Sequence, residues 1–252
     1  MGKLALQLYS VRDMAEVNLL ETIRKVSEMG YEGVQFAGFF NHSAEKVRTE
    51  LDASQIVPAG AHVGIDLLVH HFDETINFHQ SIGNDLIICP SLPENMRSTS
   101  DEYFRAAEQL NRIGEKLEKA GMTFGYHNHA FEFETFAGKT GFDILFENTD
   151  PAYVKMELDC FWASVAGFDP LRTISKYADR CVSLHMKDMK MEGEKKVSTE
   201  IGSGILDIWK IIESGKANHV DWFIVEQEDF AKHPMESAEE NAGELKKIMV
   251  GL

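Results

Sequence analysis

The strongest constraint on the fold is a regular alternation of two kinds of segment along the 252-residue chain. Short apolar runs alternate with longer runs whose apolar residues recur at helical spacing. Eight short runs are predicted as strands: Leu4–Val11, Gly33–Ala37, Ile56–Ile65, Asp85–Pro90, Thr123–His129, Val154–Phe161, Cys181–Lys187 and Trp222–Gln227. Strands that alternate with helices indicate a parallel sheet covered by helices.

The longer runs are predicted as helices, and several have clear end signals. Ser43 is a predicted N-cap, and Gly30, Gly83 and Gly121 follow the last apolar residues of their runs, as C-terminal glycines do. The helices are predicted at residues 16–29, from about 43, and at 72–82, 100–120, 141–148, 169–177, 205–214 and 236–249, and Met189–Ser203 is predicted as a polar loop.

Eight strand–helix units in 252 residues predict a (β/α)8 TIM barrel, an α/β fold formed here as a single domain over residues 1–252. No linker rich in serine, glycine or proline interrupts the alternation. A doubly wound open sheet is the alternative, since it has the same alternation. The barrel is favoured because the chain has eight strand–helix units with no element left over, and because no glycine-rich phosphate-binding turn follows the first strand.

The charge balance excludes some classes of partner. The chain has 25 Lys and Arg against 41 Asp and Glu, a formal net charge of −16. That field repels phosphate backbones and anionic lipids, so we expect no nucleic-acid partner and no membrane partner. No stretch is apolar enough to span a bilayer, and the start MGKLALQLYSVRD lacks a signal-peptide pattern. Cys89, Cys160 and Cys181 lie in apolar runs and are expected to be reduced, which predicts a cytoplasmic setting.

Ionisable residues gather where the predicted strands end, which is the end of a TIM barrel that carries the chemistry. The last four strands carry them: His127 and His129 on the fifth, Glu157 and Asp159 on the sixth, His185 and Lys187 on the seventh, and Glu226 and Glu228 on the eighth. Burying a charged group is costly unless it is paired or bound to a cation. Because these four strand ends are neighbours on one rim, the sequence predicts a shared site.

A divalent metal explains this set best. Asp159, His185 and Glu226, with one group from the fifth strand, would fill a four-ligand site. Mixed imidazole and carboxylate ligands suit Mn²⁺, Co²⁺, Zn²⁺ or Mg²⁺, and the lack of paired thiols argues against structural zinc. Glu134 and Glu157 are expected to be solvated or ion-paired. Surface positions are expected for six other histidines, His42, His70, His71, His79, His219 and His233.

The chain resembles the xylose-isomerase-like TIM barrels, a superfamily of sugar isomerases and epimerases that also holds inosose dehydratases, hydroxypyruvate isomerases and endonuclease IV. The resemblance covers essentially the whole chain. It rests on six strings: LQLYSVRD, GYEGVQFAGF, GYHNHAFEFE, MELDCFWASVAGFDP, SLHMKD and FIVEQED. The strings of the fifth to seventh strands are similar to those of a sugar phosphate isomerase/epimerase branch.

This resemblance implies a metal held by Glu, Asp, His and Glu from the fifth to eighth strands. Asp159, His185 and Glu226 match three of these positions. By strand register His127 stands in the place of the fifth-strand glutamate, and Glu132 is the ligand if it reaches back to the site. The predicted metal ligands are therefore Glu132, Asp159, His185 and Glu226, with His127 as the alternative to Glu132. A histidine in that place disfavours epimerisation by two glutamate bases.

The family's chemistry implies a metal-stabilised enediolate formed from a keto-sugar, a sugar phosphate or an inosose. The predicted catalytic residues are Glu226, His127 and Lys187: the first two would move the carbon-bound proton, and Lys187 would donate a hydrogen bond to a substrate oxygen. The predicted substrate-binding residues are His62, His129, Trp162 and Arg12, with Arg12 and His62 on the far rim.

Several functions stay open at this point. The first is a sugar isomerase or epimerase, and the second is a dehydratase that eliminates water from a keto-sugar or keto-inositol. A barrel that binds carbohydrate without catalysis is a third. A nuclease similar to endonuclease IV is disfavoured by the net charge of −16. The expected partner is a small sugar or cyclitol, and the family's frequent dimers and tetramers make a homo-oligomer a further expectation by analogy.

Overall fold

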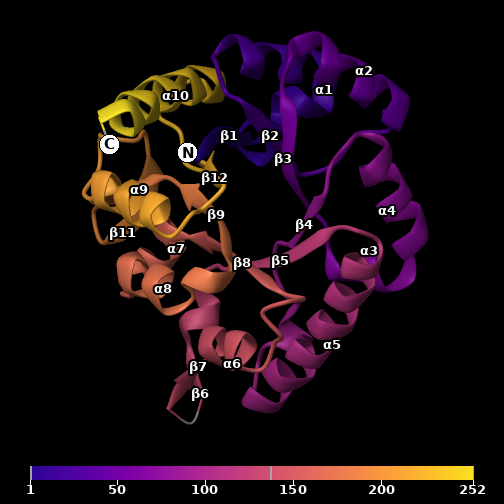
Figure 1. The fold of residues 1–252 in the computed structure, drawn as a ribbon. Helices are drawn as coiled ribbons and strands as arrows, with labels where there is room; N and C mark the ends of the chain where they lie inside the picture. The colour runs from indigo at the N-terminus through magenta and orange to yellow at the C-terminus, as the bar shows by residue number, and fades with distance from the viewer. Residues whose placement is uncertain (1, 137, 252) are drawn as a thin grey trace.

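Eight parallel strands form a closed barrel in the computed structural model, which describes residues 2–136 and 138–251. Figure 1 shows the strands at the centre of a ring of helices. Around the barrel the order is β1-β12-β9-β8-β5-β4-β3-β2. The strand bounds are β1 Lys3–Gln7, β2 Gly33–Phe36, β3 Val57–His62, β4 Leu86–Cys89, β5 Thr123–His127, β8 Lys155–Asp159, β9 Cys181–Met186 and β12 Trp222–Val225. The predicted (β/α)8 barrel is confirmed.

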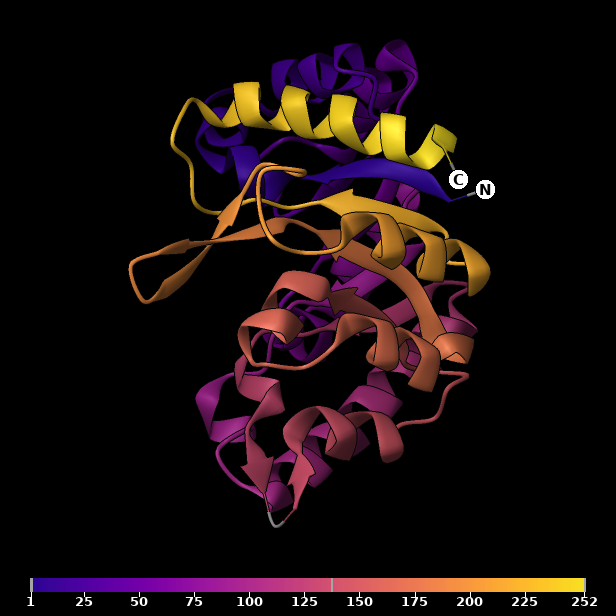
Figure 2. The ribbon, with the colours of Figure 1, turned by 90° about the vertical axis from the view of Figure 1, so that its left-hand side faces the viewer.

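Two short hairpins lie outside the barrel sheet. β6 Thr135–Phe136 pairs with β7 Lys139–Thr140, and β10 Asp188–Glu192 pairs with β11 Lys195–Thr199, both antiparallel. Figure 2 shows the β10–β11 hairpin, in orange, projecting from the end of the barrel opposite the two chain termini. The prediction of a polar loop over Met189–Ser203 is therefore wrong. Met189 and Val197 are buried, and Gly193 supplies the positive φ of 63° at the turn, so this segment has the residues that a hairpin requires.

The helices surround the barrel. Their bounds are α1 Arg12–Glu28, α2 Ala44–Ser54, α3 Ile65–His70, α4 Phe72–Ser81, α5 Ser100–Lys119, α6 Gly141–Glu147, α7 Cys160–Val165, α8 Pro170–Lys176, α9 Ile208–Ala217 and α10 Pro234–Gly251, and the 3-10 turns are η1 Leu8–Val11, η2 Glu94–Met96, η3 Phe131–Phe133 and η4 Ala178–Arg180. The Ser43 hydroxyl accepts a hydrogen bond from the Lys46 N–H, as its predicted N-cap role requires. Of the helices in the described residues, none has the length and apolarity to cross a bilayer.

The strands end earlier than the sequence predicts. β1 stops at Gln7 because the Gln7 side chain accepts a hydrogen bond from the Tyr9 N–H and so starts the η1 turn. β8 stops at Asp159, whose carboxylate caps α7 in the same way by accepting from the Trp162 N–H. The polar residues at strand ends thus turn the chain away from the sheet, which leaves their side chains at the rim.

The inside of the barrel has an apolar end and a polar end. Ala5, Ala59 and Ile224 fill the amino end of the strands, with Trp222 packed against them. Nearer the carboxyl ends the buried side chains are polar: Gln7, Gln35, Glu157, Ser183 and His185. A larger apolar cluster lies between the strands and the helices and holds the barrel closed. The three cysteines are buried and unpaired, as expected.

Candidate metal and active site

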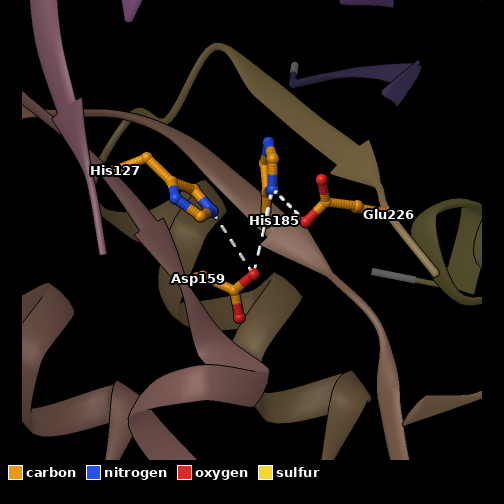
Figure 3. Close-up of side chains that lie close together, drawn as sticks. All are labelled: His127, Asp159, His185 and Glu226. Carbon is orange, nitrogen blue, oxygen red and sulfur yellow. Dashed lines mark hydrogen bonds and ion pairs between the residues drawn. The ribbon is translucent and has the colours of Figure 1, made fainter. Parts of the chain in front are cut away.

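Four side chains from four adjacent strand ends converge at the polar end of the barrel. His127 ends β5, Asp159 ends β8, His185 lies near the end of β9, and Glu226 directly follows β12. One ligand atom from each of these residues lies within 4.8 Å of the others, and all four residues are buried (Figure 3). The sheet register produces this meeting, because Asp159 is paired with His185 and the Glu226 N–H donates to the Met186 carbonyl.

The two carboxylate oxygens of Asp159 have different surroundings. Oδ1 accepts the capping hydrogen bond from the Trp162 N–H at 2.7 Å, so Oδ2 is left facing the cluster. The Asn128 side chain fixes the backbone here, since it accepts from the Asp159 N–H at 2.9 Å and donates to the Asp159 carbonyl at 3.3 Å. Asn128 is fully buried, and our sequence reasoning missed it. Its position directly after His127 was the only available signal.

A backbone carbonyl on the side away from the cluster sets the orientation of the His127 ring. Its Nδ1 lies 3.1 Å from the Pro90 carbonyl oxygen, which can only accept, so Nδ1 carries the proton. The lone pair is therefore on Nε2, which is buried 3.4 Å from Asp159 Oδ2. Across the described residues Nε2 has no hydrogen-bond partner. An imidazole held in this way is oriented as a metal ligand is.

His185 is held in a similar way. Its Nε2 lies 2.7 Å from Gln35 Oε1 and 3.1 Å from Glu157 Oε1, so these oxygens accept the Nε2 proton. Its Nδ1 faces the cluster, 3.1 Å from Glu226 Oε2 and 3.9 Å from Asp159 Oδ2. Gln35 keeps its amide orientation because Gln7 donates to the same Oε1 at 2.7 Å.

Glu157 is the centre of the polar network beneath the cluster. Its Oε1 is paired with His62 at 2.7 Å, and its Oε2 accepts from Gln35 at 2.6 Å and from Ser183 at 2.7 Å. Burial raises the pKa of Glu157, but His185 and His62 outweigh burial and hold it well below its ordinary value. The expectation that Glu157 is solvated or ion-paired is met by its pairs with His62 and His185. The network also brings His62 close to the cluster, with its ring stacked 5.3 Å from that of His185.

Lys187 places a cation directly beside the cluster carboxylates. Its Nζ lies 2.7 Å from Glu226 Oε2, 3.0 Å from Asp159 Oδ2 and 2.7 Å from Glu228 Oε1. Burial raises the pKa of Asp159 and that of Glu226, but Lys187 and the histidines outweigh it and hold both pKa values below their ordinary range. Burial lowers the pKa of His185, whereas Glu157 and Glu226 raise it, to about 10. Both carboxylates are therefore anionic near neutral pH.

Glu132, one of the predicted metal ligands, lies outside the group of four residues that forms the cluster. It lies in η3, and its two oxygens are already used: Oε1 accepts from the Tyr126 hydroxyl at 2.6 Å, and Oε2 accepts from the His129 N–H at 2.7 Å. Burial raises the pKa of Glu132 to about 7, although these hydrogen bonds oppose it. The side chain that β5 contributes to the cluster is His127, the alternative that the sequence left open.

The side chains fit a divalent ion. Asp159 Oδ2 and His127 Nε2 are buried and have no directed hydrogen bond among the residues that the structure describes. Asp159 Oδ2 has an ion pair with Lys187 Nζ at 3.0 Å, whereas His127 Nε2 has no partner in the described residues, and because a buried polar atom without a partner is costly, a cation beside Nε2 would relieve that cost. Two imidazoles and two carboxylates suit zinc, manganese or cobalt. The cluster therefore qualifies as a candidate metal site.

A cavity of about 310 Å³ opens onto the cluster and is lined by Tyr9, His62, His127, His129, Glu226 and Glu228, among others. Burial lowers the pKa of His129 to about 3, so this imidazole is neutral and faces the cavity as a hydrogen-bonding group. A larger cavity of about 610 Å³ lies between α1 and α10, but its ionisable side chains are ordinary surface ones such as Glu21 and Lys25. We therefore take the smaller cavity, which is lined by cluster residues, as the candidate active-site cavity.

The remaining predicted substrate contacts lie farther from the cluster. Arg12 stacks on the Tyr9 ring at 4.5 Å and lines a neighbouring cavity that shares Tyr9 with the first. Trp162 lies over the other side, with its ring 5.7 Å from the His129 ring and 5.7 Å from Lys187 Nζ. The Trp162 backbone, by contrast, contacts the cluster directly, because its N–H donates to Asp159 Oδ1 at 2.7 Å.

The structure thus defines a closed (β/α)8 barrel with a buried imidazole–carboxylate cluster at the carboxyl ends of its strands, where TIM-barrel enzymes have their active sites. A family model described as xylose isomerase-like TIM barrel matches residues 23–248. The chain belongs to this family.

Individual relatives and solved structures agree with this assignment. An inosose dehydratase from Lacticaseibacillus casei is 26% identical, over 88% of this chain and 87% of its own. A sugar phosphate isomerase/epimerase from Parabacteroides distasonis ATCC 8503 has a TM-score of 0.84 at 23% identity, covering 98% of this chain and 94% of the other. The IOLI protein with a binding zinc atom has a TM-score of 0.81 at 12% identity, covering 99% and 98%.

Proposed function

We propose that this protein is a divalent-metal-dependent enzyme that removes the carbon-bound proton next to a carbonyl group of a small polyhydroxylated ketone, such as an inosose or a keto-sugar. The observation that carries the proposal is the buried set of His127, Asp159, His185 and Glu226, whose possible ligand atoms lie within 4.8 Å of one another beside a cavity of about 310 Å³. The zinc in the IOLI protein, a barrel of the same fold, supports the same reading.

Each part of the site has a distinct role in this proposal. A divalent ion held by the four residues would stabilise the negative charge that develops on the substrate oxygen as the proton leaves. Glu226 lines the cavity and is anionic, so its carboxylate would accept the proton. The neutral His129 would donate or accept a hydrogen bond with a substrate hydroxyl. Lys187 would offset the charge of the two carboxylates and orient a substrate oxygen.

Loss of water is the outcome we favour after deprotonation. The inosose dehydratase from L. casei aligns over 88% of this chain, which supports a hydroxyl leaving from the adjacent carbon. The histidine from β5 gives a further reason. Epimerisation by two carboxylates on opposite faces of the substrate needs a second carboxylate in the cluster at that position, and His127 occupies it instead.

Isomerisation or epimerisation is the second candidate, supported by the Parabacteroides distasonis structure, which spans 98% of this chain. The deprotonation step would be the same. The difference lies in the fate of the intermediate: in a dehydratase the hydroxyl leaves, and in an isomerase or epimerase the proton returns to carbon.

The experiment is to incubate the purified protein with Mn²⁺ and inosose, and separately with a panel of ketoses and ketose phosphates, in heavy water. A product lighter by one water molecule in mass spectra supports the dehydratase. Deuterium incorporation with unchanged composition supports the isomerase or epimerase. If protein that carries Mn²⁺ gives neither signal with any of these substrates, the result would contradict catalysis and would favour a barrel that only binds carbohydrate.

Asp159→Asn is the matched test of the site. It keeps the shape of the side chain and removes the charge, so we expect Mn²⁺ affinity to fall by at least about 100-fold and the reaction to be lost. Asp73→Asn, on the exposed face of α4, is the control and should change neither quantity. Full metal content and full activity in Asp159→Asn would show that the site is misassigned.

A further inference from the structure

The ammonium of Lys187 occupies an unusual position for a lysine. The residue is 1% exposed, and its Nζ is enclosed by three carboxylates, those of Asp159, Glu226 and Glu228, at 3.0, 2.7 and 2.7 Å. The rings of Phe161 and Trp162 lie 5.5 and 5.7 Å away on the other side. A buried cation surrounded in this way compensates anions that would otherwise repel one another.

Two of the oxygens that hold the ammonium also belong to the candidate metal site. Asp159 Oδ2 is the oxygen that faces His127 Nε2 at 3.4 Å, and Glu226 Oε2 is the oxygen that faces His185 Nδ1 at 3.1 Å. An ion that used both oxygens would therefore stand within a few ångströms of Lys187 Nζ. A monovalent and a divalent cation at such a distance repel each other strongly, because a buried site screens charge poorly.

We propose that Lys187 is an internal competitor for the metal site: its ammonium neutralises Asp159 and Glu226 while the ion is absent, and an arriving divalent ion must displace it toward Glu228. This inference rests on the proposed function, because it needs a metal to bind. It adds that metal loading and the position of Lys187 are coupled.

Glu228 gives the displaced ammonium a place to go. Its Oε1 already contacts Lys187 Nζ, yet Glu228 is not one of the four cluster residues. Unlike Asp159, Glu228 is only partly buried and lines the cavity. Metal binding would thus move a positive charge out of the ligand cluster and toward the space available to the substrate. A Lys187 that only stabilised the fold would show no such coupling.

Lys187→Met tests the competition directly, because methionine removes the charge and keeps an unbranched apolar chain. We expect its Mn²⁺ affinity, measured by calorimetry at neutral pH, to be about tenfold or more above that of the wild type. Lys187→Arg keeps the competing charge and should not show this gain. The matched control is Lys190→Met, on β10 next to Glu192, which should bind Mn²⁺ as the wild type does.

A double-mutant cycle tests the displacement toward Glu228. Glu228→Gln should weaken Mn²⁺ binding several-fold in the wild-type background, because the ammonium loses its alternative partner, and it should have clearly less effect in the Lys187→Met background. Equal effects in both backgrounds would overturn the displacement. If Lys187→Met does not fold, as judged by circular dichroism, Lys187→Gln, which also lacks the charge, takes its place in the same cycle, and equal effects of Glu228→Gln in the wild-type and Lys187→Gln backgrounds would again overturn the displacement.

The outcomes separate this inference from the proposed function. If the wild type binds Mn²⁺ and the folded Lys187→Met protein binds it no more tightly, the competition is wrong and the metal site stands. If neither protein binds Mn²⁺, the metal site is wrong and the competition falls with it. If only Lys187→Met binds Mn²⁺, the competition is supported in its strongest form.

Discussion

The two cluster histidines are oriented by hydrogen bonds on the side of each ring that faces away from the cluster, without any bound ligand. His127 gives its Nδ1 proton to the Pro90 carbonyl, and His185 gives its Nε2 proton to Gln35 and Glu157. Each ring then presents its other nitrogen to a cluster carboxylate: His127 Nε2 lies 3.4 Å from Asp159 Oδ2, and His185 Nδ1 lies 3.1 Å from Glu226 Oε2. Partners of this kind fix the tautomer and orientation of a metal-binding imidazole, so they contribute to affinity without touching the ion.

Glu157 should therefore act as a positioning residue. In Glu157→Gln an amide NH₂ group would meet the donors that now surround the carboxylate, so we expect Mn²⁺ affinity to fall by about 10- to 100-fold. We also expect a loss of about 1–3 kcal/mol in the free energy of unfolding, because buried donors lose their acceptor. Calorimetric titration and urea unfolding measure the two effects. Glu74→Gln, on the exposed side of α4, is the control, and unchanged Mn²⁺ affinity in Glu157→Gln would contradict the role.

His79 should make the free energy of unfolding depend on pH. Its predicted surface position is wrong: it is buried on α4, packs against Phe39 and Phe78, and accepts from the Asn84 amide at 3.2 Å. Burial lowers its pKa from 6.5 to about 4. Between these values the unfolded chain binds a proton and the folded chain does not, so stability falls as pH drops from about 6.5 toward 4.

The size of this effect is up to about 3 kcal/mol in the free energy of unfolding. Urea unfolding of the wild type and of His79→Gln, from pH 7 to pH 4.5, measures it by difference. The wild type should lose more stability than the variant across this interval. Parallel pH profiles for the two proteins would refute the assignment.

At the scale of elements, one helix ends with a residue that is not the most stabilising one for its backbone conformation. Gly30, Gly83 and Gly121 end their helices with positive φ values of 83°, 77° and 75°, as the sequence predicts. Gln55, at the end of α2, has a left-handed conformation with φ 54° and ψ 35° without being glycine. A residue with a Cβ atom is strained in this conformation, whereas glycine is not.

Gln55→Gly should therefore stabilise the protein by about 1 kcal/mol, because relief of the left-handed strain exceeds the entropy that glycine adds to the unfolded chain. Urea unfolding at fixed pH measures the change. Ala53→Gly lies two residues earlier in the same helix, in ordinary helical conformation, and should destabilise by a similar amount. A decrease in stability for both variants would contradict the strain at Gln55.

The Asp188 carboxylate accepts several of the backbone hydrogen bonds of the loop after the β10–β11 hairpin. Asp188 is buried, and it accepts hydrogen bonds from the N–H groups of Met189, Gly202, Gly204 and Leu206. Gly204 has no room for a side chain, since a Cβ atom there would lie 2.3 Å from Asp188 Oδ1. Asp188 therefore organises the connection from β9 to α9.

At the scale of the whole molecule, metal binding should stabilise the barrel. The four donors come from β5, β8, β9 and the residue after β12, so the cluster assembles only when distant parts of the chain are folded together. A ligand that binds only the folded state stabilises it by about 2.7 kcal/mol at 100 times its Kd. For a chain of this size we expect a rise in Tm of about 5–10 °C with Mn²⁺.

Differential scanning calorimetry with and without Mn²⁺ checks this expectation. The Asp159→Asn protein, which loses a donor, should show no such rise, and the Asp73→Asn protein should behave as the wild type. A similar rise in all three proteins would point to non-specific binding by the −16 surface charge.

The sequence by itself determined the barrel and most of the cluster. Alternating segments predict the eight β–α units, and because parallel strands place their carboxyl ends on one rim, Asp159, His185 and Glu226 could be expected together from their positions alone. The domain extent over residues 1–252 and the roles of the site residues stay predictions.

Only the tertiary structure decided which group from β5 completes the cluster and what surrounds it. Glu132 is committed to Tyr126 and the His129 N–H, and the ammonium of Lys187 lies among three carboxylates. Such contacts depend on the register of neighbouring strands and on how far each side chain reaches across the barrel. These quantities arise between segments far apart in the chain, so local sequence patterns do not contain them.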